Sequence, residues 1–391
     1  MKKRALIGAL LCLWLLGGLL LPVGAEARET TAEEEAGIAE ESAKIHPLWQ
    51  EFLGAVPAEV RELLPEGFFE EDMTKVGESV SEATALDTVL SVVGHLSGLA
   101  FREYLAVFAK VCGVLVLAAT VRAAFPAAAK GTGRAFSLCT TLVTVTLLLQ
   151  VCRRDFSEIG QYFRTVGELS LAMLPLMGTL YAMGGNISAA VCHHGVMSAF
   201  LAVLEKVCAT MVLPVAGICL ALALLDATFS DVCLRSLATL FRHTFTWGLS
   251  FLMVLLCGVL GMQTTLAKGA DTLALRTVRF AAGSFLPVVG GSVSEALRTV
   301  SGSVGYLRST VGVGGIVVLL LVFLPTFLSV LLARLCFLLS GAVAGLLSLP
   351  GEEKVLSEFA SVWGYFLAVI AALFVMNVFS LTLFAQCATA I

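Results

Sequence analysis

The chain has 391 residues, a mean hydropathy of +0.93 and only 14% charged residues, whereas a soluble domain carries about 25%. This composition excludes an ordinary soluble protein and indicates a helical bundle in lipid. The net charge of −4 combines an acidic segment, residues 26–100 with 17 acidic and four basic residues, with a basic remainder. An acidic segment joined to a basic membrane body also excludes a nucleic-acid-binding protein, which needs a clustered basic face.

Residues 1–25 have the pattern of a secretory signal peptide. Lys2, Lys3 and Arg4 precede an apolar run over 5–21, and small residues follow at Val23-Gly24-Ala25. An uncleaved anchor is the alternative, because the apolar run is slightly long. In either case residue 26 onward is expected outside the cytoplasm.

The region 26–100 is predicted to be acidic, extracytoplasmic and largely helical. Residues 26–44 are poor in large apolar groups and are expected to be disordered. Apolar residues then recur at helical spacing, and Pro47 and Pro57 suit the first turns of two short helices. Their apolar stripes either pack against each other in a hairpin or form a surface for a partner or the bilayer interface. The sequence leaves both readings open.

The remaining region, residues 101–391, is predicted to be a polytopic transmembrane domain. The fold class is therefore all-α, an integral membrane protein with about seven spans. Two further apolar pieces, 187–204 and 335–349, are short or interrupted, so the count runs from seven to nine. The seven clear candidates are 104–125, 135–152, 168–184, 207–225, 245–263, 311–333 and 361–387.

Loop charges suggest an orientation, because cytoplasmic loops are rich in Lys and Arg. The loop 126–134 is basic and is placed in the cytoplasm, as is the segment 264–310. The loops 153–167 and 350–360 are then expected outside, although the first carries three arginines.

Three features within the membrane domain are candidate structural or channel positions. Lys110 lies near the start of the first span, where its side chain can snorkel to the interface, pair with another helix or take part in a conduction path. Gly341 and Gly345 form a Gly-x-x-x-Gly pair that favours close helix packing. The segment 283–315 is unusually rich in glycine.

That glycine-rich segment has two interpretations. It contains Gly283, Gly290, Gly291 and Gly312, with Pro287 among them. A broken helix that lines a cavity at membrane depth is one reading. A flexible cytoplasmic loop with an amphipathic helix at 293–309 is the other, and we expect the loop.

No catalytic or metal-binding motif is found in the sequence. It lacks a nucleotide-binding Gly-x-x-x-x-Gly-Lys-Ser/Thr loop and the motifs of metalloproteases and esterases. Cys192-His193-His194 lacks the i, i+4 spacing of a helical metal site. No Cys-x-x-Cys pair occurs among the eleven cysteines, which are expected to be structural. We expect no enzyme activity, cofactor or bound metal.

One block resembles a known family. The stretch LRTVRF, which contains Arg276, followed by GSFLPVVG over 283–290 and LRSTVG over 307–312, is similar to the signature of the stage III sporulation protein AE family. The tripeptide Ser188-Ala189-Ala190 ahead of His193 also fits. The resemblance extends over most of residues 100–391, and 26–75 is only weakly matched.

The resemblance implies a role in endospore formation. Members of the family belong to a complex in the mother-cell membrane facing the engulfed forespore. With other membrane proteins of the same operon, a cytoplasmic ATPase and a forespore membrane partner, they are expected to build a secretion-like channel needed for late forespore gene expression through sigma G. This implies a subunit of a hetero-oligomer. The alternatives are a self-contained permease for a small solute, with its site at 283–315, and a membrane enzyme, for which no site is found.

Overall fold

The computed structural model describes residues 32–124, 130–185, 211–228 and 290–385, together with scattered residues between 191 and 262. Within these residues every regular element is a helix. The expected signal at 1–25 and the motif containing Arg276, Gly283 and Pro287 lie outside them. In chain order the helices are α2 (Ala32–Gly54), α3 (Ala58–Arg61), the 3-10 helix η2 (Glu66–Phe69), α4 (Met73–Ala83), α5 (Leu86–Ala124), α6 (Lys130–Met183), α8 (Leu213–Thr228), α10 (Gly290–Leu346) and α11 (Pro350–Ala385).

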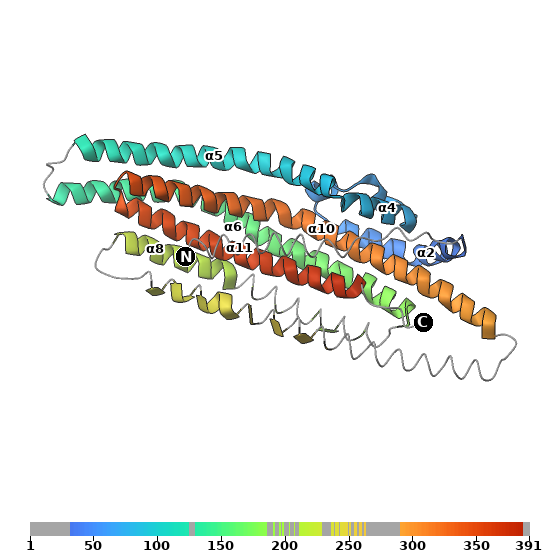
Figure 1. Ribbon diagram of the computed structural model, residues 1–391. Coiled ribbons are helices and arrows are strands. Elements are labelled where there is room, and N and C mark those ends of the chain that lie inside the picture. The colour runs from blue at the N-terminus through green and yellow to red at the C-terminus, as the bar shows by residue number, and fades with distance from the viewer. Residues whose placement is uncertain are drawn as a thin grey trace.

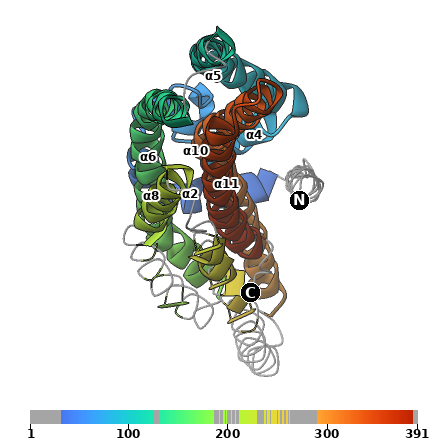
Figure 2. The same ribbon diagram turned by 90° about the vertical axis from the view of Figure 1, so that its left-hand side faces the viewer.

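The molecule is an elongated bundle of long helices (Figure 1). The helices α10 and α11 lie side by side in its centre, and α10 also contacts α2, α4, α5 and α6. Viewed from one end, α5 lies above this pair, and α6 with α8 lies to one side (Figure 2). The large fully buried side chains of α11, among them Trp363, Phe366 and Phe384, form much of the core.

Four helices of the described chain are long and apolar enough to cross a membrane, with candidate spans at Ala100–Ala123, Cys139–Met183, Gly302–Leu346 and Pro350–Ala385. The all-α fold class is thus confirmed, whereas the count of seven remains a prediction. In the predicted span 245–263 and in the open candidate 187–204, the structure describes only scattered residues. The predicted span 207–225 overlaps α8, and only part of it lies within the described residues.

Several predicted loops are helical. The expected outer loop 153–167 lies inside α6, which runs without interruption through both predicted spans on either side of it. The glycine-rich segment is helical from Gly290 onward, so both the flexible loop and the broken helix are wrong for 290–315. The piece 335–349 continues the span 311–333 within α10, and 350–360 forms the first turns of α11. In each case long-range packing overrides the local charge and glycine content.

The turn between α10 and α11 has the geometry of a Schellman cap. Ser348 has a positive φ of 58°. The amide of Leu349 donates to the carbonyl of Ala344, and the amide of Ser348 donates to that of Gly345. This pattern satisfies the last carbonyls of a helix and usually places glycine at the left-handed position. Pro350 then begins α11, where its missing amide costs nothing.

The N-terminal region, residues 32–85, is docked on the bundle. Its apolar stripes are buried, with Trp49 0% exposed and Val76 0% exposed. They pack against α10 and α6, because α2 contacts both helices and α4 contacts α10. The stripes therefore form neither a self-contained hairpin nor a free surface, the two readings that the sequence left open.

The boundaries of these helices also differ from the predicted ones. Residues 32–44 belong to α2 and are not disordered in the structure. Pro47 lies inside α2 and not in its first turn, whereas Pro57 precedes α3 as its N-cap. Apolar residues also recur at helical spacing between Val76 and Leu96. The structure divides this stretch between α4 and the start of α5, which continues directly into the first candidate span.

Candidate functional site

Three glycines of α10 form a junction where four helices meet, which we call the glycine junction: Gly312, Gly314 and Gly315. A Cβ atom at Gly314 would lie 2.9 Å from Trp49 Cη2 of α2. A Cβ atom at Gly312 would lie 2.7 Å from Ala385 Cβ of α11. Gly315 faces Met173 of α6 in the same way. Glycine is required here because the neighbouring helices approach the backbone of α10 closely.

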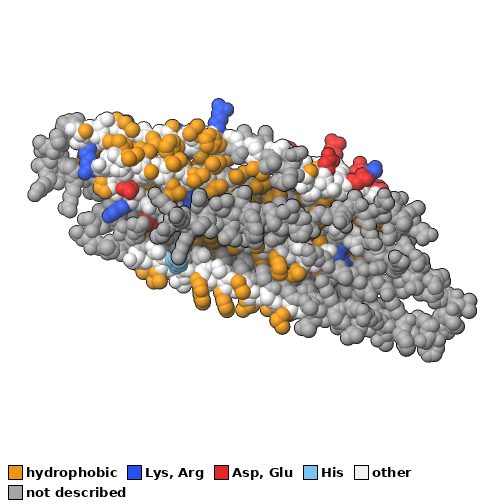
Figure 3. Space-filling view, in the orientation of Figure 1, with side chains coloured by type: hydrophobic (Ala, Val, Ile, Leu, Met, Phe, Trp, Pro, Cys, Tyr) orange, Lys and Arg blue, Asp and Glu red, His pale blue; other side chains and the backbone are white. Residues whose placement is uncertain are grey.

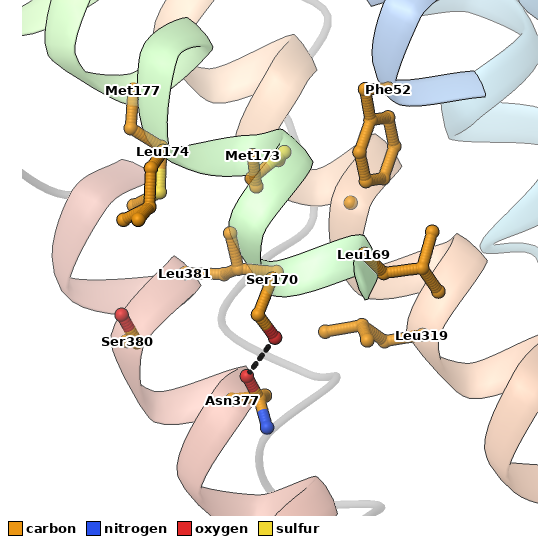
Figure 4. Close-up of a pocket in the computed structure, with 11 residues that line it drawn as sticks. Phe52, Leu169, Ser170, Met173, Leu174, Met177, Leu319, Asn377, Ser380 and Leu381 are labelled. Carbon is orange, nitrogen blue, oxygen red and sulfur yellow. Dashed lines mark hydrogen bonds between the residues drawn. The ribbon is translucent and has the colours of Figure 1, made fainter. Parts of the chain in front are cut away.

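A small cavity adjoins the glycine junction (Figure 4). The helices α2, α6, α10 and α11 all contribute to its wall. Most lining side chains are apolar, such as Phe52 and Leu319. A polar contact closes one side, where Ser170 Oγ donates to Asn377 Oδ1 at 2.8 Å. This contact links α6 to α11, and Ser380 of α11 is a further polar residue in the mostly apolar wall.

Arg308, in the first half of α10, contacts the C-terminal end of α6. Its side chain is fully buried. Nη2 donates to the carbonyl oxygen of Leu180 at 3.0 Å, and the guanidinium lies 5.2 Å from the centre of the Tyr181 ring. Leu180 is in the last turn of α6, where the helix dipole favours a positive charge, and its carbonyl also accepts a hydrogen bond from the amide of Gly184. A side chain at Gly184 would collide with this guanidinium.

Asp155 joins three helices near the middle of the bundle. The carboxylate is 2% exposed. Tyr104 of α5 donates to Oδ1 at 3.0 Å, and the indole N–H of Trp363 of α11 donates to Oδ2 at 2.8 Å. The neighbouring Arg154 forms ion pairs with Glu103 on α5 and with Glu158 on α6. A buried carboxylate is tolerated when donors satisfy both oxygens.

A second buried carboxylate lies at the turn end of the bundle. Glu352, in the first turn of α11, is 1% exposed. Thr140 Oγ1 of α6 donates to its Oε1 at 2.6 Å, and Thr141 Oγ1 donates to the same atom at 3.3 Å. Arg122 at the end of α5 donates to the carbonyl oxygen of Ser348 at 3.1 Å. These contacts tie α5 and α6 to the α10–α11 turn.

The predicted positions are spread over the bundle and do not meet in one place. Lys110 is exposed on α5. Gly290 and Gly291 begin α10, while Gly312 belongs to the glycine junction. A Cβ atom at Gly341 would lie 3.5 Å from Leu356 Cβ, and one at Gly345 would lie 3.3 Å from Glu353 Cδ. Both glycines thus face α11, as the packing interpretation predicts.

The structural contacts missed by the sequence involve side chains that look ordinary in isolation. In the sequence, Trp49 is one of the apolar residues that recur at helical spacing after residue 44, and Asp155 lies in the expected loop 153–167. Arg308 was part of the family motif without a role of its own. The signal available for Arg308 and Asp155 was a charge beside long apolar stretches, which is rare unless the group has partners.

In the described part of the chain, no group of three or more His, Cys, Asp or Glu side chains is placed to hold a metal ion. One titratable group of the N-terminal region has a defined shift. Asp72 caps α4, and hydrogen bonds from the hydroxyl and the amide of Thr74 lower the pKa of its carboxyl. The arrangement is one of helix-to-helix anchors, suited to holding a membrane protein in a fixed shape.

The fold and these anchors are those of a multi-pass α-helical membrane protein with an N-terminal region packed on its bundle. The family model described as stage III sporulation protein AE matches residues 72–388. A relative, the stage III sporulation protein AE of Bacillus subtilis (strain 168), is 25% identical over 243 residues, which is 62% of this chain and 60% of that protein. No solved structure matches the chain.

The chain belongs to the stage III sporulation protein AE family, because the family model covers most of its length. The resemblance found in the sequence is thereby confirmed. The family is one of sporulation proteins. The match begins at Asp72, the N-cap of α4, so it includes α4 to α11 and leaves out α2 and Trp49.

Proposed function

We propose that this chain is a membrane subunit of a secretion-like channel complex between mother cell and forespore, and that it supports late forespore gene expression through sigma G. The family match over residues 72–388 carries the proposal. The subunit lies in the mother-cell membrane that faces the forespore, with the N-terminal region on the extracytoplasmic side. Its partners are the other stage III operon membrane proteins, their ATPase and a forespore membrane protein.

The architecture supports an assembly subunit. The helices α6 and α10 are roughly 81 and 85 Å long at 1.5 Å per residue, because they contain 54 and 57 residues. The N-terminal region extends this rigid body with an acidic surface, on which Glu59, Glu62 and Glu70 are exposed. A long, stiff body with a charged, water-facing end is suited to contact other proteins beyond its own membrane.

The permease alternative relied on a helix break within 283–315. Residues 290–315 form an uninterrupted part of α10, and 283–289 lie outside the described residues. The cavity beside the glycine junction has a mostly apolar wall, with Ser170, Asn377 and Ser380 as its polar residues. The family match favours the assembly subunit over a self-contained permease.

Affinity purification from sporulating cells tests the proposal. The chain, tagged at its C-terminus and expressed from its own promoter, is solubilised in mild detergent and its partners are identified by mass spectrometry. We expect the other stage III membrane proteins in stoichiometric yield. An unrelated multi-pass protein of the same membrane, tagged in the same way, is the control. Recovery of the chain by itself, under conditions that preserve another complex of that membrane, contradicts the proposal.

A further inference from the structure

The four long helices are much longer than a bilayer is thick. Even α11, with 36 residues, extends for roughly 54 Å, whereas the hydrocarbon core measures about 30 Å. Only part of each helix is therefore able to lie in lipid. The exposed side chains show which part.

One boundary lies at the α10–α11 turn. Arg122, Glu353 and Lys354 are exposed there. The hydrogen bond from Arg122 to Ser348 places the end of α5 at the level of this turn. Charged and exposed side chains at a helix end are expected at the edge of the hydrocarbon and not within it.

The other boundary lies near the middle of the bundle. Arg102, Glu103, Arg153 and Arg154 are exposed on α5 and α6. The ion pair of Arg154 with Glu103 puts them at one level. From Arg102 to Arg122 the helix α5 rises by about 30 Å, which equals the thickness of the hydrocarbon core.

Between these boundaries the exposed side chains are mainly aliphatic, apart from Lys110 and the hydroxyls of Thr120 and Thr146, which bond to carbonyls of their own helices. We call this set the lipid-facing belt. Its members are Leu105, Val116 and Leu117 on α5, Leu142, Val143 and Leu149 on α6, and Leu335, Leu338, Leu339 and Leu346 on α10. Apolar side chains gather over this half of the molecule, whereas acidic side chains are seen over the other (Figure 3).

The exposed face of α6 changes character at the boundary. Before it, the face carries Leu142, Val143 and Leu149. After it, the exposed residues are mainly polar: Gln150, Arg153, Arg154, Ser157, Gln161, Arg164 and Glu168. The exposed surface of α6 is thus apolar in its first part and polar in its second part. The sequence predicts two spans along this same stretch.

Lys110 is the exception within the belt, and its geometry accounts for it. It lies eight residues, or about 12 Å, inside the Arg102 boundary. Side chains of an α-helix lean toward its N-terminus, which is the direction of that boundary. The ammonium group therefore reaches most of the way to water by snorkelling.

The first half of α10 is covered by protein. All residues from Thr310 to Phe323 are buried, and Trp49 packs over Gly314. The N-terminal region that covers them exposes many carboxylates, such as Glu51 and Glu78, which require water. Gly314 lies 32 residues, or about 48 Å, before the end of α10 at Leu346, which exceeds the thickness of the hydrocarbon core.

We propose that the bilayer surrounds only the half of the bundle that carries the lipid-facing belt. The other half of the four long helices projects from the membrane on the side of the N-terminal region, and α2 and α4 cover the apolar start of α10 in place of lipid. Exposed apolar side chains such as Trp247 and Phe251 also occur between 237 and 262. Phe245 of that partly described stretch packs against Tyr365 of α11, and the boundaries are drawn from the four long helices alone.

Spin labels on α6 test the proposal with a matched pair of leucines. Leu142, 58% exposed, lies in the belt, and Leu171, 48% exposed, lies in the projecting half. Each is replaced by cysteine in a cysteine-free full-length chain in nanodiscs, and collision with oxygen or with a soluble nickel chelate is measured. We expect position 142 to favour oxygen and position 171 to favour nickel, with several-fold opposite ratios.

An oxygen-dominated signal at position 171, equal to that at 142, overturns the proposal, because α6 would then cross lipid over 168–184. The unmodified protein provides a second test that does not depend on the folding of a variant. In nanodiscs with a photoreactive acyl chain, adducts are expected on peptides of 136–150 and 335–346. Adducts of equal yield on 302–315 or 157–168 overturn it as well.

Discussion

Replacing Gly314 by alanine is expected to loosen the N-terminal region from the bundle. The added Cβ atom would lie 2.9 Å from Trp49 Cη2 and 3.3 Å from Val80 Cγ2. Both neighbours are buried, so neither has free space to move into. Overpacking of this kind costs about 1–3 kcal/mol, which shifts the equilibrium between docked and undocked forms by roughly 5- to 150-fold.

Gly305 supplies a matched control on the same helix. A Cβ atom there meets no heavy atom within 4 Å. Alanine is a better helix former than glycine by about 0.5–1 kcal/mol, so Gly305→Ala should leave docking unchanged and stabilise α10 slightly. The two variants differ only in what the new methyl group touches.

Limited trypsin digestion of the purified chain in nanodiscs measures the difference. Arg61 and Lys75 are exposed cleavage sites within the N-terminal region, and cleavage follows the population of opened molecules when reclosing is fast. We expect faster cleavage at both sites in Gly314→Ala and an unchanged rate in Gly305→Ala. Equal rates in the two variants would refute the close packing of Trp49 on α10.

Four further outcomes are expected. Arg308→Met should destabilise the bundle by about 2–4 kcal/mol in thermal unfolding, since the buried contacts of the guanidinium with the Leu180 carbonyl and the Tyr181 ring are lost, and the lysine variant should lose less. Asp155→Leu should cost about 2–3 kcal/mol by stranding two buried donors, whereas a cost below about 0.5 kcal/mol argues against those bonds. Asp72→Ala should weaken α4 by about 1 kcal/mol at pH 7. Because the pKa of Asp72 is lowered in the folded chain, the stability difference between the variant and the natural sequence is present above the ordinary pKa of 3.8. It should disappear as the pH falls through the lowered pKa of the folded chain, and hydrogen exchange of α4 measures it. Ser348→Gly should raise the unfolding temperature and Ser348→Val should lower it, because valine resists a positive φ.

The class of fold could be predicted from the sequence because long apolar stretches recur along the chain. Apolar stretches such as 311–333 leave a helix in lipid as the only solution, and the structure places them in α10 and α11. The family was also predicted from a short block around Arg276 and Arg308, and the family match confirms it.

The connections could not be predicted from the same signal. Charges at 153–167 and glycines at 290–315 are typical of loops, yet both stretches are helical because partners satisfy them. Asp155 is buried by Tyr104 and Trp363 from two other helices, which are 51 and 208 residues away. Such partners cannot be identified from the local sequence. A span count based on hydropathy therefore divides the one long helix α6 into two spans.

The docking of the N-terminal region could not be predicted from the sequence for a related reason. An amphipathic stripe shows that a helix needs a covering surface, but it does not say which one. The covering surface is a run of glycines on α10, more than 250 residues away from Trp49 in the chain. Gly314 lies in the glycine-rich segment for which the sequence predicts a loop. In the structure, the absence of a side chain at Gly314 lets the Trp49 indole lie close to the backbone of α10.

The most direct test of the proposed function is a sigma G-dependent reporter in the forespore of the native host. The gene for this chain is deleted and then restored at a second locus, and the reporter is measured beside an earlier forespore reporter. The account predicts that deletion abolishes the late signal, preserves the early one, and that restoration recovers the late signal in full. An undiminished late signal in the deletion strain would contradict the account.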